Sequence, residues 1–472
     1  MWFEFAPEKP AQTRYRQLVY LVSTNTVSEN AEKPLSIKTI MTTKTHTHII
    51  GRLMGLLAFS FLPTLASANE LDTGDTAWML TSSALVLFML LPGLSLFYAG
   101  LVRSKNVLSV LMQCFAIASA MSLLWFAVGY SLVFSGDGDW IGNLDKAFLS
   151  GVSFDSMSGT IPESVFVVFQ MTFIMITPAL FVGGFAERMN FAPMLVFSVL
   201  WGLIVYVPVT HWVWGGGWLA DKGLLDFAGG VVVHVTAGVS ALVAALVIGN
   251  RKGFPQKPMT PHSLTLTVVG AGMLWFGWFG FNGGSALGAN GNAGMAMLVT
   301  HLSAAAGCIA WMTIEWVRFR KPSVLGIVTG MVAGLGTITP ASGFVGPIGG
   351  VVIGLCGGTV CYFATQFIKG GLKIDDSLDV FPVHGVGGAL GTILAAVFVS
   401  TAYGGVGYAQ GMGLVSQLGV QVLGIVVAGV YAAIVSYVLL TLIGLVMPLR
   451  ADEETEQQGL DVVQHGETGY NM

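Results

Sequence analysis

The sequence predicts an all-α polytopic membrane protein with eleven transmembrane helices. Of the 472 residues, 54% are hydrophobic and only 10% are charged, whereas a soluble domain carries about 25% charged residues. A helix needs about 20 apolar residues to cross a bilayer, and we count eleven candidate segments. The predicted spans are Thr76–Gly100, Val107–Phe134, Ser164–Phe185, Phe191–Val209, Phe227–Ile248, Leu264–Phe281, Ala293–Trp316, Val324–Ile338, Gly346–Phe367, Val383–Ser400 and Gly411–Leu445.

The basic residues of the connecting loops support this number of spans. Loops after odd-numbered spans contain twelve Lys and Arg residues, and loops after even-numbered spans contain two, Lys146 and Lys222. Cytoplasmic loops carry an excess of Lys and Arg. The alternation therefore predicts a mature N-terminus outside the membrane and a C-terminus in the cytoplasm.

The first ten spans can be divided into two halves of five. Asp226 lies eight residues before His234 at span five, and Asp376 lies eight residues before His384 at span ten. Because five is an odd number, the halves would have opposite orientations, as in transporters built from inverted repeats. The eleventh span has 35 residues and would be about 52 Å long at 1.5 Å per residue, so it must tilt or extend beyond the membrane. The expected architecture is two inverted five-helix repeats plus a long tilted C-terminal helix.

The segment before the first span resembles a secretory signal peptide. Met41 opens a short basic stretch, which is followed by an apolar run from Leu53 to Leu65 and by Ala66-Ser67-Ala68, an A-x-A cleavage pattern. We expect residues 1–40 to be an extension foreign to the native protein, 41–68 the signal peptide, 69–447 the transmembrane domain and 448–472 a cytoplasmic tail. The alternative is a genuine cytoplasmic extension followed by an uncleaved helix.

Two histidines, His234 and His384, lie deep inside hydrophobic segments. A titratable ring is costly in hydrocarbon, so such a residue usually faces a bundle interior or a pathway. A single buried histidine is more often a packing residue, but two at matching places in two half-repeats favour a function. Two neutral imidazoles can hydrogen-bond to each other and still offer an N–H or a lone pair to a small polar solute, or relay a proton. They predict a central permeation path.

Other candidates lie near the ends of spans. Asp226 is interpreted either as a helix cap or as a negative charge that favours a nearby cation, and Asp376, on the cytoplasmic side, as a cap. Four aromatic residues near the outer ends and a neighbouring serine could form a cation site, because aromatic faces attract cations and a hydroxyl accepts hydrogen bonds. These residues are Phe169, Phe173, Trp214, Phe281 and Ser285.

Several classes of function are disfavoured. The sequence has no Walker A motif, no Rossmann fingerprint, no H-E-x-x-H and no G-x-S-x-G elbow, so we expect neither an enzyme nor a bound cofactor. It has no Cys/His spacing typical of a metal site, and no basic patch with interleaved aromatics that would indicate nucleic-acid binding.

Five separate motifs closely resemble those of the ammonium transporter (Amt/Mep/Rh) family, and the bacterial Amt branch in particular. The resemblance covers roughly residues 75–472. The motifs are Asp226-Phe-Ala-Gly-Gly230 through His234 to Arg251, Gly277-Trp-Phe-Gly-Phe-Asn282, Thr339-Pro-Ala-Ser-Gly343, Asp379-Val-Phe-Pro-Val-His384-Gly385 and Pro92-Gly-Leu-Ser-Leu-Phe97-Tyr98.

The resemblance implies roles for individual positions. The outer ammonium site of the family would be Trp214, Phe173 and Ser285, with Asp226 beside it. The two stacked gate phenylalanines would be Phe173 and Phe281, with Phe169 one turn before, and the twin pore histidines would be His234 and His384. The expected function is ammonium transport: NH4+ is recruited outside and deprotonated, and NH3 passes the histidines while the proton returns or crosses separately.

Two alternatives remain open at this stage. One is a sensor that binds ammonium and signals through its tail, which the shortness of the tail disfavours. The other is a Rh-like gas channel for NH3 or CO2, which the complete outer cation site disfavours.

The resemblance also implies partners. The family forms homotrimers in the cytoplasmic (inner) membrane, with one pore in each subunit, and methylammonium is a further expected substrate. The acidic tail resembles the regulatory tail that couples subunits and receives a PII-type signalling protein. Its motifs are Asp452-Glu-Glu454, Gly459-Leu-Asp461 and His465-Gly-Glu467.

Overall fold

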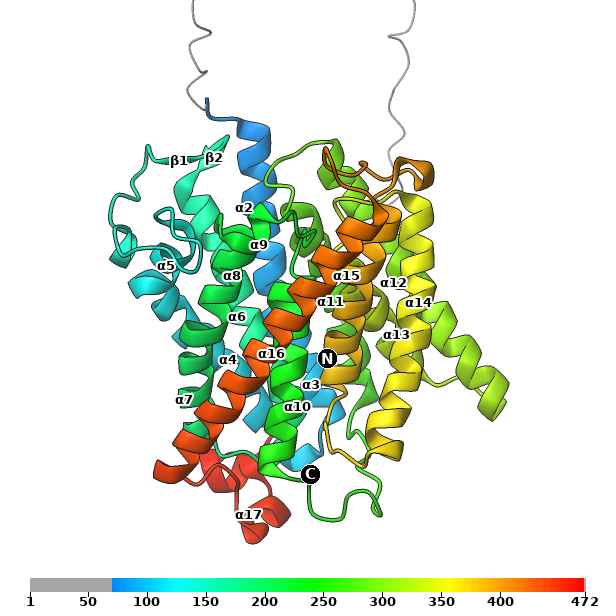
Figure 1. Cartoon of the computed structure of the whole chain (residues 1–472). Coiled ribbons are helices and arrows are strands. Elements are labelled where there is room, and N and C mark those ends of the chain that lie inside the picture. Colours follow the sequence, from blue (N-terminus) through cyan, green and yellow to red (C-terminus); the bar gives the residue numbers. More distant parts are fainter. Residues whose placement is uncertain (1–69, 471–472) are drawn as a thin grey trace, which may run out of the picture. The chain divides into compact units, whose positions relative to one another are not determined.

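The computed structural model describes residues 70–470, and nearly all of the regular structure in this part is helical (Figure 1). The first half contains a short hairpin, in which Met157 pairs with Pro162, and five membrane-spanning segments. Its elements are α2 (Thr73–Phe88), α3 (Ser95–Leu101), α4 (Val107–Leu124), α5 (Tyr130–Phe134), β1 (Met157–Ser158), β2 (Ile161–Pro162), α6 (Glu163–Phe185), α7 (Phe191–Trp201), α8 (Val207–Trp214), α9 (Trp218–Asp221) and α10 (Thr236–Ile248).

The second half continues with five further spans, one long C-terminal helix and a short helix in the tail. Its elements are α11 (Leu264–Trp278), α12 (Gly291–Phe319), α13 (Val324–Ile338), α14 (Pro347–Gln366), α15 (Val386–Phe398), α16 (Leu414–Val446) and α17 (Glu453–Gln458).

Several spans are continuous helices in which one turn is a wider, π-type helix. Such turns are frequent at functional sites, and here two of them carry the histidines: Gly230–Val235 directly precedes α10, and Phe381–Gly385 directly precedes α15. The turn Met89–Leu94 joins α2 to α3 and contains Pro92, which cannot donate a helical hydrogen bond.

The predicted spans are confirmed. Ten helices are long and apolar enough to cross a membrane in the described part of the chain, and the shorter apolar helix Val324–Ile338 is the eleventh. The largest difference is in span four, which was expected to end at Val209 but continues through α8 and α9 to Asp221. The predicted extension and signal peptide fall within residues 1–69, which lie outside the described residues.

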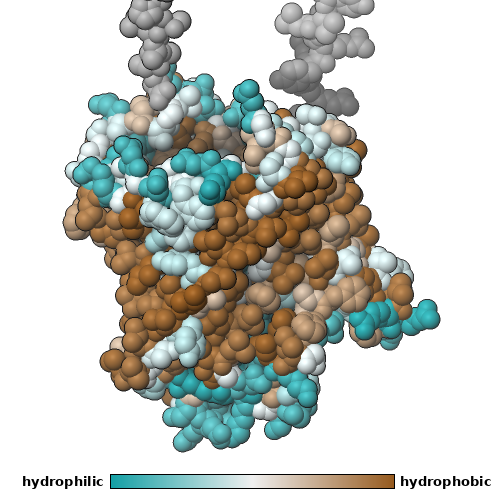
Figure 2. Space-filling model, in the orientation of Figure 1, coloured by the Kyte–Doolittle hydropathy of each residue, from teal (hydrophilic) through white to brown (hydrophobic). Residues whose placement is uncertain are grey.

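The surface agrees with a protein that is integral to a membrane. Apolar residues cover most of the middle of the visible face, and hydrophilic residues gather at its two ends (Figure 2). The last span, α16, has 33 residues and crosses the other helices obliquely (Figure 1). At 1.5 Å per residue it is about 50 Å long, which accounts for its tilt.

The two histidine-bearing helices pack against each other in a reciprocal way. A Cβ atom added at Gly238 of the first would lie 2.3 Å from the Gly385 nitrogen of the second. A Cβ added at Gly388 would lie 2.7 Å from both the Gly230 carbonyl oxygen and the His234 Cβ. These glycines let the two backbones touch, and the reciprocal contact agrees with an inverted repeat.

A buried ion network fastens the two halves at the face with most basic residues. The Arg251 guanidinium forms ion pairs with Glu187 and with Asp375, both at 2.7 Å, and Arg103 reaches Glu187 at 3.0 Å. Burial would raise the pKa of the Glu187 carboxyl, but the guanidinium groups of Arg251 and Arg103 hold it below its usual value. Because Asp375 comes from the second half, this network fixes the start of the His384 helix relative to the first half.

Candidate functional site

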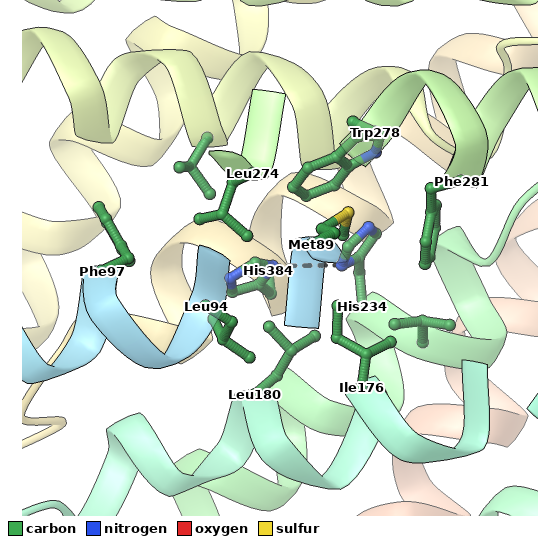
Figure 3. Close-up of a pocket in the computed structure, with 12 residues that line it drawn as sticks. Met89, Leu94, Phe97, Ile176, Leu180, His234, Leu274, Trp278, Phe281 and His384 are labelled. Atoms are coloured by element: carbon green, nitrogen blue, oxygen red, sulfur yellow. Dashed lines mark hydrogen bonds between the residues drawn. The ribbon is translucent and has the colours of Figure 1, made fainter. Parts of the chain in front are cut away.

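His234 and His384 meet at the centre of the bundle. Their Nδ1 atoms are 3.2 Å apart and the two rings are tilted by only 21° (Figure 3). The side chains are buried, with 1% and 5% exposure. A hydrogen bond between two Nδ1 atoms requires one ring to carry the Nδ1 proton and the other to accept it. In neutral rings the first then has a lone pair at Nε2 and the second an N–H, so the pair offers one acceptor and one donor.

A narrow cavity runs along this histidine pair. Its volume is about 10 Å³, which is room for about one water molecule. Apart from the two imidazoles, the side chains around it are apolar or aromatic (Figure 3). They are Met89, Leu94, Phe97, Ile176, Leu180, Val233, Leu274, Trp278, Phe281 and Val332. We call this cavity the central chamber.

Two stacked phenylalanines close the chamber at one end. The rings of Phe173 and Phe281 have centroids 4.3 Å apart and are tilted by 26°. Phe281 lines the central chamber, and Phe173 lines a larger pocket of about 310 Å³ beyond it. This outer pocket is separated from the histidines by the thickness of the two rings.

The outer pocket brings together the aromatic and hydroxyl groups predicted for a cation site. Trp214 lies edge-to-face against Phe173, with centroids 5.6 Å apart. The Ser285 hydroxyl donates to the Phe281 carbonyl at 2.8 Å, so its lone pairs remain free to accept from another donor. The remaining lining residues are Phe134, Phe166, Gln170, Val213, Phe227 and Leu287.

Asp226 does not line this pocket, and it has the geometry of a helix cap. Its carboxylate accepts hydrogen bonds of 2.5–3.1 Å from four consecutive main-chain N–H groups, those of residues 229–232. Burial raises the pKa of the Asp226 carboxyl, and these four amides oppose the rise. Its link to the outer pocket is through the main chain, because Trp214 Nε1 donates to the Asp226 carbonyl at 2.8 Å.

Phe169 lies behind the stacked pair. Its ring is fully buried and packs edge-on against Phe173 at 5.1 Å, and it lines neither the outer pocket nor the central chamber. Any influence of Phe169 on the gate therefore acts through the position of Phe173.

A third cavity opens on the other side of the histidines. It has a volume of about 230 Å³ and shares His384, Phe97 and Val332 with the central chamber. Its wall also carries the ion pair between Lys369 and Asp379, whose charged atoms are 2.8 Å apart. We call it the inner vestibule. His384 thus stands between the chamber and a polar space, whereas His234 lines the chamber and not the vestibule.

Sequence reasoning missed two residues that organise the site. Trp278 stacks on His234 with centroids 5.7 Å apart and donates from Nε1 to the Thr339 hydroxyl at 2.9 Å. Asp75, near the start of α2, accepts from the Thr160 hydroxyl at 2.5 Å and from the Ala289 N–H at 2.8 Å. It ties the loop after Ser285 to the β-hairpin. Trp278 stands in one of the quoted motifs, but Asp75 gave no signal beyond its N-terminal helix position.

No group of three or more His, Cys, Asp or Glu side chains suitable for a metal ion occurs in residues 70–470.

Comparison with known proteins decides the family, because residues 77–470 match the model of the Ammonium Transporter Family. This chain belongs to the ammonium transporter family.

Individual relatives agree with this membership. The chain is 46% identical to an ammonium transporter of Bacillus subtilis over 404 residues, which cover 85% of this chain and 99% of the relative. Among solved structures, it resembles a protein described as a sensor Amt protein with a TM-score of 0.78 and 32% identity, over 83% of this chain and 98% of that one. It resembles Saccharomyces cerevisiae Mep2 with a TM-score of 0.72 and 38% identity, over 84% and 93%.

Proposed function

We propose that this protein moves ammonium across the cytoplasmic membrane by separating the cation into ammonia and a proton. The observation that supports this most directly is the hydrogen-bonded pair of His234 and His384 in an apolar chamber that has room for about one water-sized molecule. A dehydrated cation is costly in such surroundings, whereas neutral NH3 is of suitable size and can exchange hydrogen bonds with the pair.

The outer pocket is proposed to recruit NH4+. The faces of Trp214 and Phe173 attract a cation, and the Ser285 oxygen can accept one of its N–H groups. Asp226 supports the site by holding Trp214 through its carbonyl and by its buried negative charge. Potassium has a similar size and charge but cannot donate a hydrogen bond or lose a proton, so it would bind less well and could not pass as a neutral species.

Transfer through the pore requires the Phe173 and Phe281 rings to move aside. NH4+ loses one proton at the outer side, NH3 enters the central chamber, passes His234 and then His384, and reaches the inner vestibule. The proton either returns to the outer solution or crosses along the two imidazoles, which already share a hydrogen bond. The second route makes transport electrogenic.

The remaining assignments follow the resemblance and the loop charges. We propose a homotrimer in the inner membrane, with the mature N-terminus outside, and regulation at the cytoplasmic face by a PII-type protein. The way the tail is held supports the last point. The Asp461 carboxylate accepts the N–H groups of Leu108 and Ser109 at the start of α4, and Glu456 pairs with Arg450 at 2.8 Å. A partner that moved the tail would act directly on a span.

Electrical recording on solid-supported membranes with the reconstituted protein tests the proposal. An ammonium pulse is expected to evoke a current, and a potassium pulse is not. Uptake of ammonia without current would support a gas channel instead. Ammonium binding with neither uptake nor current would favour the sensor, the function named for one of the structural relatives.

A further inference from the structure

A hollow of about 440 Å³ lies on the face with most basic residues, next to the inner vestibule, with which it shares the lining residue Met259. Three separate stretches of the chain form its wall: the turn between α3 and α4, the loop between α10 and α11, and α17 in the tail. The lining residues are Arg103, Lys105, Lys252, Lys257, Pro258, Met259, Glu456 and Gln457. We call this hollow the basic pocket.

The charges of the basic pocket are poorly balanced. Its lining carries four cationic side chains and one carboxylate, so the formal sum is +3. The carboxylate, Glu456, is 2% exposed and already bonded, since it pairs with Arg450 and accepts the Lys252 N–H at 2.7 Å. It therefore offers little compensation to the pocket cations.

The cations themselves retain binding capacity. Within residues 70–470, neither Lys105 nor Lys257 forms an ion pair with a carboxylate, and Arg103 Nη2 has no hydrogen-bond partner. Lys105 donates only to the main-chain carbonyls of Glu456 and Gln457. Arg103 and Lys252 have acidic partners, Glu187 and Glu453, that do not line the pocket.

We propose that the basic pocket binds a small phosphate-bearing anion. An excess of basic residues on one face follows from membrane insertion alone, but that rule does not require four of them to converge from two loops on one hollow. Lysine supplies a point charge to a phosphate, and an arginine N–H supplies a directed hydrogen bond. The phosphate belongs either to a soluble polyphosphate or to the headgroup of an anionic lipid, and the chemistry of recognition is the same.

The position of the pocket gives this binding a consequence. Glu456 and Gln457 belong to the tail, and the other lining residues belong to the membrane domain. An anion in the pocket would add attraction between Lys105 and Lys257 without displacing the carbonyls that Lys105 holds. Both lysines belong to the membrane domain, so the anion would act on the tail through Lys105, which donates to the tail carbonyls of Glu456 and Gln457. A ligand that binds only this docked arrangement stabilises it by mass action.

The test compares full-length protein with the variant Lys257→Glu. The Lys257 side chain is exposed and forms no hydrogen bond or ion pair with the described residues, and its main-chain N–H, which donates to the Gly253 carbonyl at 2.7 Å, is unchanged by the substitution, so the variant should fold. Lys321→Glu is the matched control, because it makes the same charge change in an exposed loop on the same face but outside the pocket. Affinity is measured by calorimetry with inorganic pyrophosphate, at an ionic strength fixed with chloride, and in parallel with vesicles that contain phosphatidylglycerol.

Wild type and Lys321→Glu should bind pyrophosphate equally, and Lys257→Glu should bind it at least tenfold more weakly. A tenfold loss of vesicle binding in Lys257→Glu alone, without pyrophosphate binding by any form, assigns the pocket to a lipid headgroup. Equal binding by Lys257→Glu and Lys321→Glu to both probes, or no binding by wild type, would overturn the proposal.

Discussion

The helices that carry His234 and His384 begin in similar ways but lie in different surroundings. Each is preceded by an aspartate that lies eight residues before its histidine, and each begins with a π-type turn. In the first, the carboxylate of Asp226 is satisfied by four amides. In the second, Asp376 Oδ2 accepts the Phe381 N–H at 2.7 Å, and Oδ1 has no partner among the described residues.

The difference continues at the histidines. His234 packs against Trp278 and Phe281, whose ring centroids are 5.7 and 6.3 Å from the imidazole, and it lines the central chamber but not the inner vestibule. His384 lines the chamber and the inner vestibule together. The two similar helix starts therefore place their histidines differently. His234 is held within the apolar interior, and His384 separates that interior from a polar space.

The largest effects are expected from removing the rings themselves. In both His234→Ala and His384→Ala, selective ammonia passage should fall at least tenfold while the protein still folds. Loss of the His384 ring joins the chamber to the vestibule, so potassium leakage should be greater in His384→Ala. Ammonium and potassium currents from reconstituted protein measure both quantities. Wild-type rates and potassium exclusion in both variants would refute the proposed role, and equal leakage would refute the asymmetry.

The two caps provide the next comparison. Asp226→Asn replaces one acceptor oxygen by an NH2 group that faces main-chain N–H donors, and each charged hydrogen bond contributes about 1.5–3 kcal/mol. We expect a loss of roughly 3 kcal/mol in stability. Asp376→Asn keeps an oxygen for its single amide and should cost no stability at neutral pH. Thermal unfolding in detergent measures the difference, and an equal loss in both variants would mean that the caps are equivalent.

A smaller effect should depend on pH. Burial raises the pKa of Asp376 to about 6, and the nearby negative charge of Asp379 contributes, whereas an unfolded aspartate has a pKa of about 3.9. The folded state therefore holds this proton more tightly. The resulting stability, about 3 kcal/mol, is fully present below about pH 4 and is lost as pH rises through 6.

The pH effect is measured as the difference in unfolding free energy between wild type and Asp376→Asn from pH 4 to 7. Asparagine mimics the protonated acid, so the variant should gain stability relative to wild type across this window. Asp221→Asn, at the exposed C-terminal end of α9, is the control and should show no such trend. A constant difference across the window would contradict the raised pKa.

Hydropathy and loop charge were sufficient to predict the spans, because each span must meet the length and polarity of the bilayer by itself. The histidine pair was also predictable, since equal Asp-to-His spacing in two halves indicates equivalent positions. The choice of Trp214, Phe173 and Ser285 came from the family resemblance. Their proximity depends on two helices, α6 and α8, and a loop that are distant in sequence.

Other features required the structure. Sequence spacing could not show that the Asp226 carboxylate accepts hydrogen bonds from four main-chain amides. It also could not show that Phe169 lies behind Phe173 and lines neither adjoining cavity. The bracing of His234 by Trp278 depends on how α11 packs, and no local pattern encodes that. The basic pocket could not be predicted either, because in the sequence its cations were only ordinary members of two loops with several basic residues.

The glycine contact between the two half-helices has one more consequence. Gly238 contacts the Gly385 nitrogen, and Gly388 contacts the Gly230 carbonyl oxygen. The main chains of the two helices are therefore in direct contact next to the residues that carry the imidazoles. No side chain acts as a spacer there that a substitution could trim or lengthen. The interval between the rings is consequently a property of the scaffold, and an alanine at either glycine would spread the pair without touching an imidazole.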